Sequence, residues 1–434
     1  MPYSAEFSGR LPRKWRYWIL LLGLLVSIVL GIVDRTQTGF PAQWNHLFLD
    51  SFLKYSANEK IAQNAVVIDI DDVSLAAAGQ WPWPRYRMAS LVQAVADGKP
   101  AAIGLDILFS EPDRTSLNNI QKSFKQDFGL DISFVGASAG FSNNDGYFGH
   151  VLSGTNVVGA RYFYFDHISK AEISARPEFH FTGRTDLLAL NDAPGVLNNT
   201  YEISSQLKFS GFLNNQPDSD GMLRRVPLLI RHQGVIYPHL ALATFMRSLG
   251  ADAAAIEEDW NGPVIRVGNH SIPISKSGFA LLRFNGKPPL YPAISALDIL
   301  NGSFPAAEIK GKIVFIGSSA AALNDLHSTI FDSQFPGLKS QAVIMENIKT
   351  DSFIREPSWA GTAILLACIA TGLLVSALFI FLRGPLQICI GTATLASIIL
   401  LISIYLFQSG GIFLSPGAPV MVTMVLFALF TTAR

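Results

Sequence analysis

Strongly apolar, uncharged runs lie at both ends of the chain and enclose a long polar region. These runs cover residues 17–33, 358–382, 386–407 and 412–433. A transmembrane α-helix needs roughly 20 apolar residues to cross the hydrocarbon core, and each run is near that length. We therefore predict four transmembrane helices, with a short segment at 1–16 before them and a folded domain at 34–357 between the first two.

Basic residues in front of the first run indicate how it crosses the membrane. They are Arg10, Arg13, Lys14 and Arg16. Because positively charged flanks stay in the cytoplasm, we predict a cytoplasmic N-terminus and an extracytoplasmic domain. With four crossings the chain ends at the cytoplasmic face at Arg434. Arg383, between the second and third runs, also lies on the cytoplasmic side in this orientation, as expected for a basic residue. No small-residue cleavage site precedes Asp34, so we expect an uncleaved signal anchor.

Small residues recur at four-residue spacing within two of the apolar runs. They are Gly23, Ser27 and Gly31 in the first run, and Ala363, Ala367 and Thr371 in the second. Such spacing is typical of helix faces that pack closely in membranes. It predicts that helix one packs closely against another helix and, if the chain forms a homodimer, that helix one contributes to the contact. The alternative is that these are scattered small residues with no common role.

The polar region begins with a strand–helix–strand pattern. Apolar strands are predicted at 65–68 and 101–105, with a helical pattern at 86–96 between them. Strands with few polar residues are typical of a parallel sheet that is covered on both faces. More strands are predicted at 157–163 and 311–317. The expected fold is therefore α/β, with a mixed, mainly parallel sheet, plus an all-α membrane part.

Polar residues follow these strands where each one ends. Asp69 and Asp71 come after the first strand and Asp106 after the second. Ligands of open α/β sheets bind at that edge, and clustered carboxylates suit a divalent cation. The alternative is that these aspartates cap helices or pair with Arg85 and Arg87.

Further candidate ligand-binding residues follow the strand at 311–317. Ser318 and Ser319 form a turn that offers backbone N–H groups to an anion, or simply a strand–helix turn. With Asp325 and His327 they also suggest a hydrolase, but no nucleophile elbow is present. The segment 218–221 resembles part of a calcium loop, although a hairpin turn fits it better because Pro227 stands where a bidentate Glu is needed.

Composition excludes some classes of protein. The chain has 33 basic and 33 acidic residues, so it lacks the positive excess of a general nucleic-acid binder. Its two cysteines, Cys368 and Cys389, both lie in apolar runs, so the polar region holds no disulfide. No cofactor is evident, and the histidines show no metal-ligand spacing.

Several motifs occur together in the polar region. They are Val66–Asp72, Trp81-Pro82-Trp83-Pro84-Arg85, Gly104-Leu105-Asp106 with Phe109, Asp218-x-Asp220-Gly221 with Arg224-Arg225-x-Pro227, and Gly311–Gly317 with Asp325. In this order and spacing the chain resembles the type-two CHASE domain, a cyclase- and histidine-kinase-associated sensory extracellular domain. The likeness covers most of residues 40–350, and the three apolar helices that follow match the usual layout of the family.

The resemblance implies a multi-pass receptor of the bacterial inner membrane, with a periplasmic sensor and both termini cytoplasmic. Its output would be an adenylate or guanylate cyclase or a kinase, which is expected to be fused or docked after Arg434. The stimulus, a small molecule or an envelope ligand, is not implied, and neither are catalytic residues. Two alternatives remain: an extracytoplasmic metal-dependent enzyme using the strand-end carboxylates, and a structural envelope-binding membrane protein.

Overall fold

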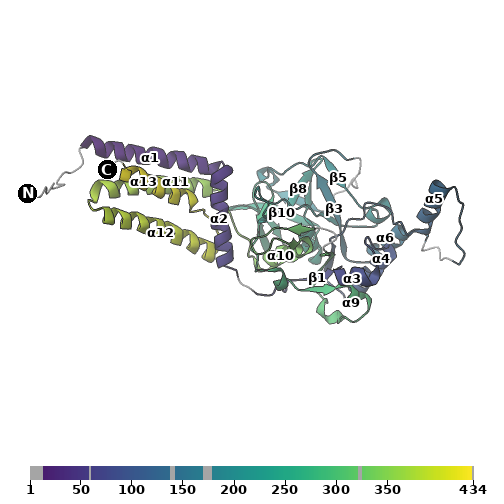
Figure 1. The fold of residues 1–434 in the computed structure, drawn as a ribbon. Helices are drawn as coiled ribbons and strands as arrows, with labels where there is room; N and C mark the ends of the chain where they lie inside the picture. The colour runs from purple at the N-terminus through teal and green to yellow at the C-terminus, as the bar shows by residue number, and fades with distance from the viewer. Residues whose placement is uncertain (1–12, 58–59, 137–141, 170–177, 321–324, 433–434) are drawn as a thin grey trace, which may run out of the picture. The chain divides into compact units, whose positions relative to one another are not determined.

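The computed structural model describes residues 13–57, 60–136, 142–169, 178–320 and 325–432 (Figure 1). The chain forms two compact units. The α/β unit contains residues 57–354, and the helical unit contains residues 1–56 and 355–434. The predicted domain at 34–357 therefore differs from the α/β unit mainly by the segment at 34–56, which the structure places in the helical unit.

The helical unit contains five helices in its described residues. They are α1 (Arg13–Arg35), α2 (Gly39–Tyr55), α11 (Ala360–Phe381), α12 (Pro385–Gly410) and α13 (Gly417–Thr432). Among the described residues, α1, α11 and α12 are long and apolar enough to cross a membrane. The predicted fourth span begins later than expected, because residues 412–416 are not helical. As a result α13 has only 16 residues, and its crossing stays a prediction.

The small-residue face of α1 packs against α11 of the same chain. A Cβ atom at Gly372 would meet the hydroxyl of Ser27. A Cβ atom at Gly31 would lie 2.6 Å from Leu365 Cδ1, and Ser27 is fully buried. Helix one therefore does pack through its small residues, but its partner is intramolecular. The structure describes one chain, so the predicted homodimer stays a prediction.

On α11 the close contacts come from a different set of small residues than predicted. Gly372 and Ser376 face α1, whereas Ala363 and Ala367 are only half-buried. Gly23 lies opposite Ser376 and Gly31 lies opposite Leu365, so α1 and α11 run antiparallel.

A seven-stranded sheet organises the α/β unit. Its order is β14 (Ala293–Ser295), β1 (Ala65–Asp69), β15 (Ile313–Gly317), β2 (Ala102–Leu105), β3 (Val157–Tyr164) and β5 (Gly195–Leu197), with β6 (Ser210–Phe212) also paired to β3. Every pairing is parallel except that of β5 with β3. The predicted mainly parallel α/β sheet is confirmed.

Helices cover both faces of this sheet. Alternate residues of a strand point to opposite faces, so Val67 joins one core and Ile68 joins the other. The core containing Val67 is covered by α8 (Leu240–Ser248) and α10 (Gly337–Thr350). The core containing Ile68 is covered by the helices α4 (Arg85–Asp97), α6 (Asn144–Ser153) and α9 (Ala296–Leu300). Burial on both faces explains why β1, β2 and β15 are apolar without alternation.

Smaller elements complete the α/β unit. A four-stranded sheet has the order β12 (His270–Pro273), β11 (Gly262–Val267), β10 (Ala253–Asp259) and β4 (His180–Gly183). Three strand pairs are β8 (Leu229–His232) with β9 (Val235–Pro238), β7 (Arg225–Pro227) with β13 (Phe279–Leu281), and β16 (Leu326–His327) with β17 (Phe335–Pro336). The remaining helices are α3 (Asp72–Ala78), α5 (Leu117–Phe128) and α7 (Tyr201–Ser204).

Candidate functional site

Asp69 and Ser319 join two neighbouring strands at the carboxyl edge of the parallel sheet. Asp69 ends β1 in register with Gly317, the last residue of β15. The backbone N–H of Ser319 donates to Asp69 Oδ1 at 2.8 Å, and its hydroxyl donates to Oδ2 at 2.5 Å. Burial raises the pKa of Asp69, although these hydrogen bonds act in the opposite direction. The sheet thus places a buried carboxylate where ligands of this fold class bind.

The two serines after β15 turn towards the strand ends. Ser318 donates its hydroxyl to the carbonyl of Ile70 at 2.6 Å. The N–H of Ala320 donates back to Ser318 Oγ at 3.2 Å. With the N–H of Ser319 on Asp69, these groups are already satisfied, and no helix begins within residues 318–320. The anion-cradle interpretation of this turn finds no support.

Asp71 has a structural partner. It is the N-cap of α3, where its Oδ1 accepts from the N–H of Ser74 at 2.7 Å and from the hydroxyl of Ser295 at 3.2 Å. This is the capping alternative that the sequence left open. Within the described residues, Asp69, Asp71 and Asp106 do not bring three ligand atoms together. The predicted metal set of these three aspartates therefore does not form.

Asp106 lies at the same edge, directly after β2. Its N–H donates to the carbonyl of Ile316 at 2.7 Å, and a Cβ atom at Gly317 would lie 3.1 Å from Asp106 Cβ. Gln341 of α10 donates its side-chain N–H to Asp106 Oδ2 at 3.4 Å. Burial, together with the nearby charge of Asp325, raises the pKa of Asp106 to about 7. Part of its surface nevertheless remains accessible to solvent.

Asp325 and His327 extend this edge. Asp325 Oδ1 lies 3.5 Å from His327 Nε2, and the same nitrogen lies 3.0 Å from Asn215 Nδ2. A Cβ atom at Gly337 would collide with the Asp325 carboxylate, so only glycine lets α10 begin this close to it. We call the set Asp69, Asp106, Asn215, Ser319, Asp325, His327 and Gln341 the edge cluster.

Sequence reasoning missed two members of the edge cluster. Gln341 is 1% exposed, but in the sequence it is only the first residue of a predicted helix at 341–350 that carries several polar residues. Asn215 precedes the turn at 218–221 and looked like part of a loop. Neither residue type suggested a partner more than 100 positions away.

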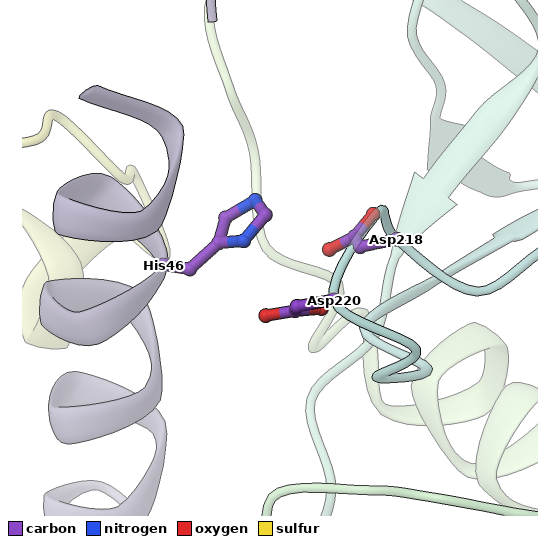
Figure 2. Close-up of side chains that lie close together, drawn as sticks. All are labelled: His46, Asp218 and Asp220. Carbon is purple, nitrogen blue, oxygen red and sulfur yellow. The ribbon is translucent and has the colours of Figure 1, made fainter. Parts of the chain in front are cut away.

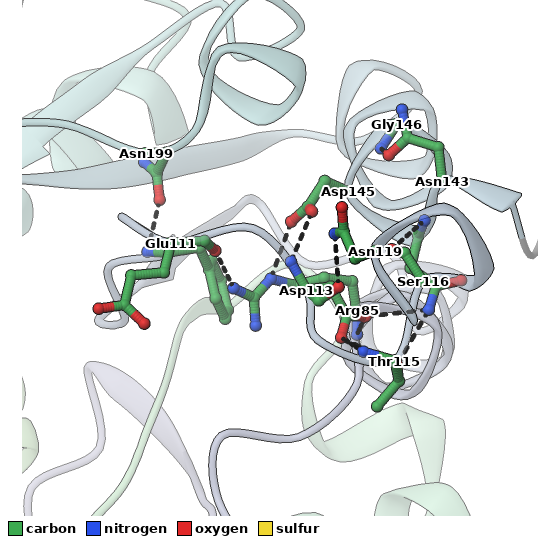
Figure 3. Close-up of polar contacts among 12 residues, drawn as sticks. Arg85, Glu111, Asp113, Thr115, Ser116, Asn119, Asn143, Asp145, Gly146 and Asn199 are labelled. Atoms are coloured by element: carbon green, nitrogen blue, oxygen red, sulfur yellow. Dashed lines mark hydrogen bonds and ion pairs between the residues drawn. The ribbon is translucent and has the colours of Figure 1, made fainter. Parts of the chain in front are cut away.

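Arg85 lies in a separate polar cluster, shown in Figure 3. Its side chain is nearly buried, and its Nε donates to Asp145 Oδ1 at 3.1 Å. Its Nη2 donates to the carbonyl of Glu111 at 2.8 Å, and the guanidinium lies 4.4 Å from the centre of the Phe109 ring. None of these partners is a strand-end aspartate, so the alternative in which those aspartates pair with Arg85 is not found. Arg85, a candidate ligand-binding residue, lies in this separate cluster.

Asp113 holds the start of α4 in the same cluster. It accepts the N–H of Arg85 at 2.8 Å, and its own N–H donates to Asp145 Oδ2 at 2.7 Å. Burial alone would raise the pKa of Asp113, but hydrogen bonds from Arg85 and Thr115 outweigh it and lower the pKa. A cavity of about 190 Å³ adjoins this cluster. Its lining includes Gln80, Trp81, Glu111, Arg114 and Thr115.

The turn at 218–221 carries a third polar cluster within the α/β unit. Arg224, which is 2% exposed, pairs with Asp218 at 3.2 Å and with Asp220 at 2.9 Å. Gly221 has a φ of 81°, which favours glycine. Figure 2 labels both aspartates, together with His46 of α2 in the helical unit. Arginine partners and a tight turn do not resemble a calcium loop. The predicted hairpin does not form at this turn either, because the strand before it, β6, pairs with β3 and the strand after it, β7, pairs with β13.

The sequence of this chain matches a known family over most of its length. A family model for the CHASE2 domain covers residues 21–380. The chain belongs to the CHASE2 family. CHASE2 domains are extracellular sensory domains of signalling receptors, and the suspected type-two CHASE resemblance is thus confirmed. No curated protein and no solved structure gives a significant match.

The chemistry of the edge cluster fits binding better than hydrolysis. In this CHASE2 chain the hydroxyl of Ser319 bonds to Asp69, and that of Ser318 bonds to Ile70. Neither serine is hydrogen-bonded to His327, so the Ser, Asp and His residues do not form a catalytic relay. What the edge offers is a set of carboxylate and amide oxygens.

Proposed function

We propose that this CHASE2 chain is the receptor part of a bacterial inner-membrane signalling protein. Its α/β unit faces the periplasm and binds a stimulus at the edge cluster. The helical unit relays the change to a cytoplasmic adenylate or guanylate cyclase or a kinase, either fused or docked. The observation that carries the proposal is the extent of the CHASE2 match, which runs from within α1, through the α/β unit, to within α11.

The pairing of α1 with α11 supports a relay. Because the two helices are antiparallel, the end of α1 and the start of α11 lie at the same end of the pair. Arg35 Nη2 donates to Thr362 Oγ1 at 3.0 Å at that end. The chain enters α11 soon after the α/β unit ends, whereas α2 stands between α1 and the start of that unit. A movement of the α/β unit would therefore reach α11 directly and α1 through α2.

The end of α1 is also tied to other parts of the helical unit. Asn45 of α2 donates to Asp34 Oδ1 at 2.9 Å, and Ser415 donates its hydroxyl to Asn45. Trp44 donates its indole N–H to the carbonyl of Gly417 at 3.2 Å. This buried polar contact links α1, α2 and the start of α13, so a shift of α1 would be felt in the last helix. The proposed receptor acts as a homodimer through a surface other than the α1 face.

Cysteine labelling tests the membrane arrangement. Cys368 and Cys389 are first replaced by Ala, and single cysteines are placed at the exposed residues Lys276, Asn301 or Arg383. In intact spheroplasts a membrane-impermeant maleimide should label the first two positions, while Arg383→Cys should be labelled only after lysis. The reverse pattern would overturn the proposed orientation.

A reporter fusion tests the relay. The chain is joined after Arg434 to a cyclase catalytic domain in cells that lack cyclase activity, and cyclic AMP is measured while the external medium is varied. Output that changes with the medium supports a receptor. Output that stays constant, combined with retention by purified envelope fractions, would favour the structural envelope-binding alternative.

A further inference from the structure

The edge cluster contains two carboxylates with no cationic side chain beside them. Asp106 has one close polar partner, the amide of Gln341, and the charge that most affects it is the like charge of Asp325. Among the described residues, Asp325 forms an ion pair with His327. Within the part of the chain that the structure describes, neither aspartate forms an ion pair with Lys or Arg. The charge of Asp325 therefore disfavours the ionised form of the buried Asp106.

Gln341 supplies an independent sign of a missing partner. Its side chain is 1% exposed, and its amide group faces Asp106. Its Oε1 atom is buried with no hydrogen-bond donor. A buried amide oxygen without a partner costs roughly 1–3 kcal/mol, so such atoms in native proteins call for an explanation. The Oδ1 atom of Asn215 is also buried without a hydrogen-bond donor, and the Nδ2 atom of the same side chain lies 3.0 Å from His327 Nε2.

These observations have one explanation in common. A divalent cation needs hard oxygen ligands, and carboxylates and side-chain amide oxygens are among its usual partners. The cluster offers both kinds, and its net negative charge would attract the ion. Asp106, Asp325 and His327 do not place three ligand atoms within 4.8 Å of one another. The carboxylate and amide oxygens of the cluster are hard ligands, which favours Ca²⁺ or Mg²⁺ over zinc.

We propose that the stimulus of this receptor includes a divalent cation of the Ca²⁺ or Mg²⁺ type, held by Asp106 and Asp325 with the amide oxygen of Gln341. The proposal rests on the proposed function for its location outside the cell. Two carboxylates make a weak site, in the range of roughly 10⁻⁴–10⁻³ M that is typical of extracellular modules.

The cation would also connect three separate elements of the fold. Asp106 follows β2, Asp325 precedes β16, and Gln341 lies on α10. Asp325 also accepts the N–H of Gly337, the first residue of α10, through its backbone carbonyl at 2.9 Å. Binding would therefore draw the start of α10 towards the sheet edge, which gives the ion a way to change the shape of the α/β unit.

The test uses the purified full chain in detergent and measures binding of CaCl₂ and MgCl₂ by calorimetry and by thermal shift. KCl at matched ionic strength controls for screening. We expect saturable binding that raises the unfolding midpoint. Asp106→Asn, Asp325→Asn and Gln341→Met should each weaken binding by at least about tenfold, since affinity follows the ligand set. Asp127→Asn, which changes an exposed carboxylate on α5, should bind as the wild type does.

Asp325→Asn keeps the test meaningful if changes at the buried positions impair folding, because Asp325 is 54% exposed. No saturable binding, or equal weakening by Asp127→Asn, would overturn the cation site. A midpoint that responds to neither cation, with a pH dependence that Asp106→Asn reduces, would show that the cluster takes up a proton instead. The relay is tested separately by the reporter fusion. Cation binding together with constant reporter output would contradict the signalling role but would still support the cation site.

Discussion

Ser319 donates two hydrogen bonds to Asp69, one from its backbone N–H and one from its hydroxyl. The pair fixes the turn after β15 to the end of β1, so two neighbouring strands share one buried carboxylate. Asp69 is 7% exposed. A hydrogen bond to a charged group contributes more to stability than one between neutral groups, so this contact is a sensitive point in the edge cluster.

Ser319→Ala should destabilise the α/β unit. The substitution removes the hydroxyl donor and keeps the backbone donor, so we expect a loss of about 2 kcal/mol, the usual value for a hydrogen bond to a charged partner. Thermal unfolding of the full chain in detergent measures it. Ser303→Ala, at an exposed position, is the matched control. Equal midpoints for the two variants would show that the Ser319 hydroxyl contributes nothing.

His239 should make the stability of the α/β unit depend on pH. Its Nδ1 accepts the N–H of Ala241 at 3.2 Å, and its Nε2 is buried without a partner. Burial lowers the pKa of His239 to about 3, from 6.5 for an exposed imidazole. The folded state keeps the ring neutral while the unfolded chain takes up a proton below pH 6.5. The stabilising contribution is therefore complete above 6.5 and is lost as the pH falls towards 3.

His239→Asn isolates this effect, because Asn does not titrate and still accepts at a helix N-cap. The stability advantage of the wild type over the variant should shrink by about 2 kcal/mol between pH 7 and pH 5, at 1.4 kcal/mol per pH unit below 6.5. Chemical unfolding at the two pH values measures the difference. An advantage of the same size at both would contradict the assignment.

The antiparallel contact of α1 with α11 should tolerate no larger side chain at Gly372. A Cβ atom there meets the Ser27 hydroxyl and lies 2.8 Å from the carbonyl of Gly23. Overpacking of this kind costs about 1–3 kcal/mol. Gly372→Leu should lower the unfolding midpoint in detergent. It should also reduce the yield of a disulfide between cysteines engineered on α1 and α11. Ala370→Leu adds the same side chain at an exposed position, and it should leave both measurements unchanged.

Much of the sheet could be predicted from the sequence because β1, β2 and β15 are buried on both faces. Burial leaves little room for polar residues, so each strand appears as a short apolar run. Where the strands end was equally clear, since Asp69 and Asp106 break those runs. The position and the end of each strand depend on residues that are adjacent in the sequence, so both can be recognised without knowing what the strand packs against.

The partners of polar residues could not be predicted in the same way. Arg85 pairs with Asp145, which lies 60 positions later, and nothing in the pattern singles out that aspartate over Asp71. Gln341 meets Asp106 only because α10 packs across β15 and β1. The small residues of α1 did predict close packing, but sequence spacing does not say whether the partner helix belongs to the same chain or to a second copy.

The Arg85–Asp145 pair gives the last prediction. Both side chains are about 95% buried, at 5% and 4% exposure. Removing one member leaves the other charge buried without its partner, which typically costs about 3 kcal/mol or more. Arg85→Met and Asp145→Asn should therefore each lower the unfolding midpoint strongly. The double variant Arg85→Met/Asp145→Leu should lose clearly less than the sum of the single changes, because both changes remove the same ion pair. The Asp113 carboxylate stays in the double variant and keeps the backbone N–H groups of Arg85 and Thr115 as donors.

The exposed pair of Arg184 with Asp186 provides the control, since salt bridges of that kind contribute little. Arg184→Ala should leave the midpoint near that of the wild type. Strictly additive losses at Arg85 and Asp145 would show that the two side chains do not stabilise each other. A large loss with Arg85→Met alone would instead point to the stacking of the guanidinium on Phe109 and its bond to the carbonyl of Glu111, which Asp145→Asn leaves in place. The cycle thus distinguishes an ion pair that supports the start of α4 from an arginine that only fills space there.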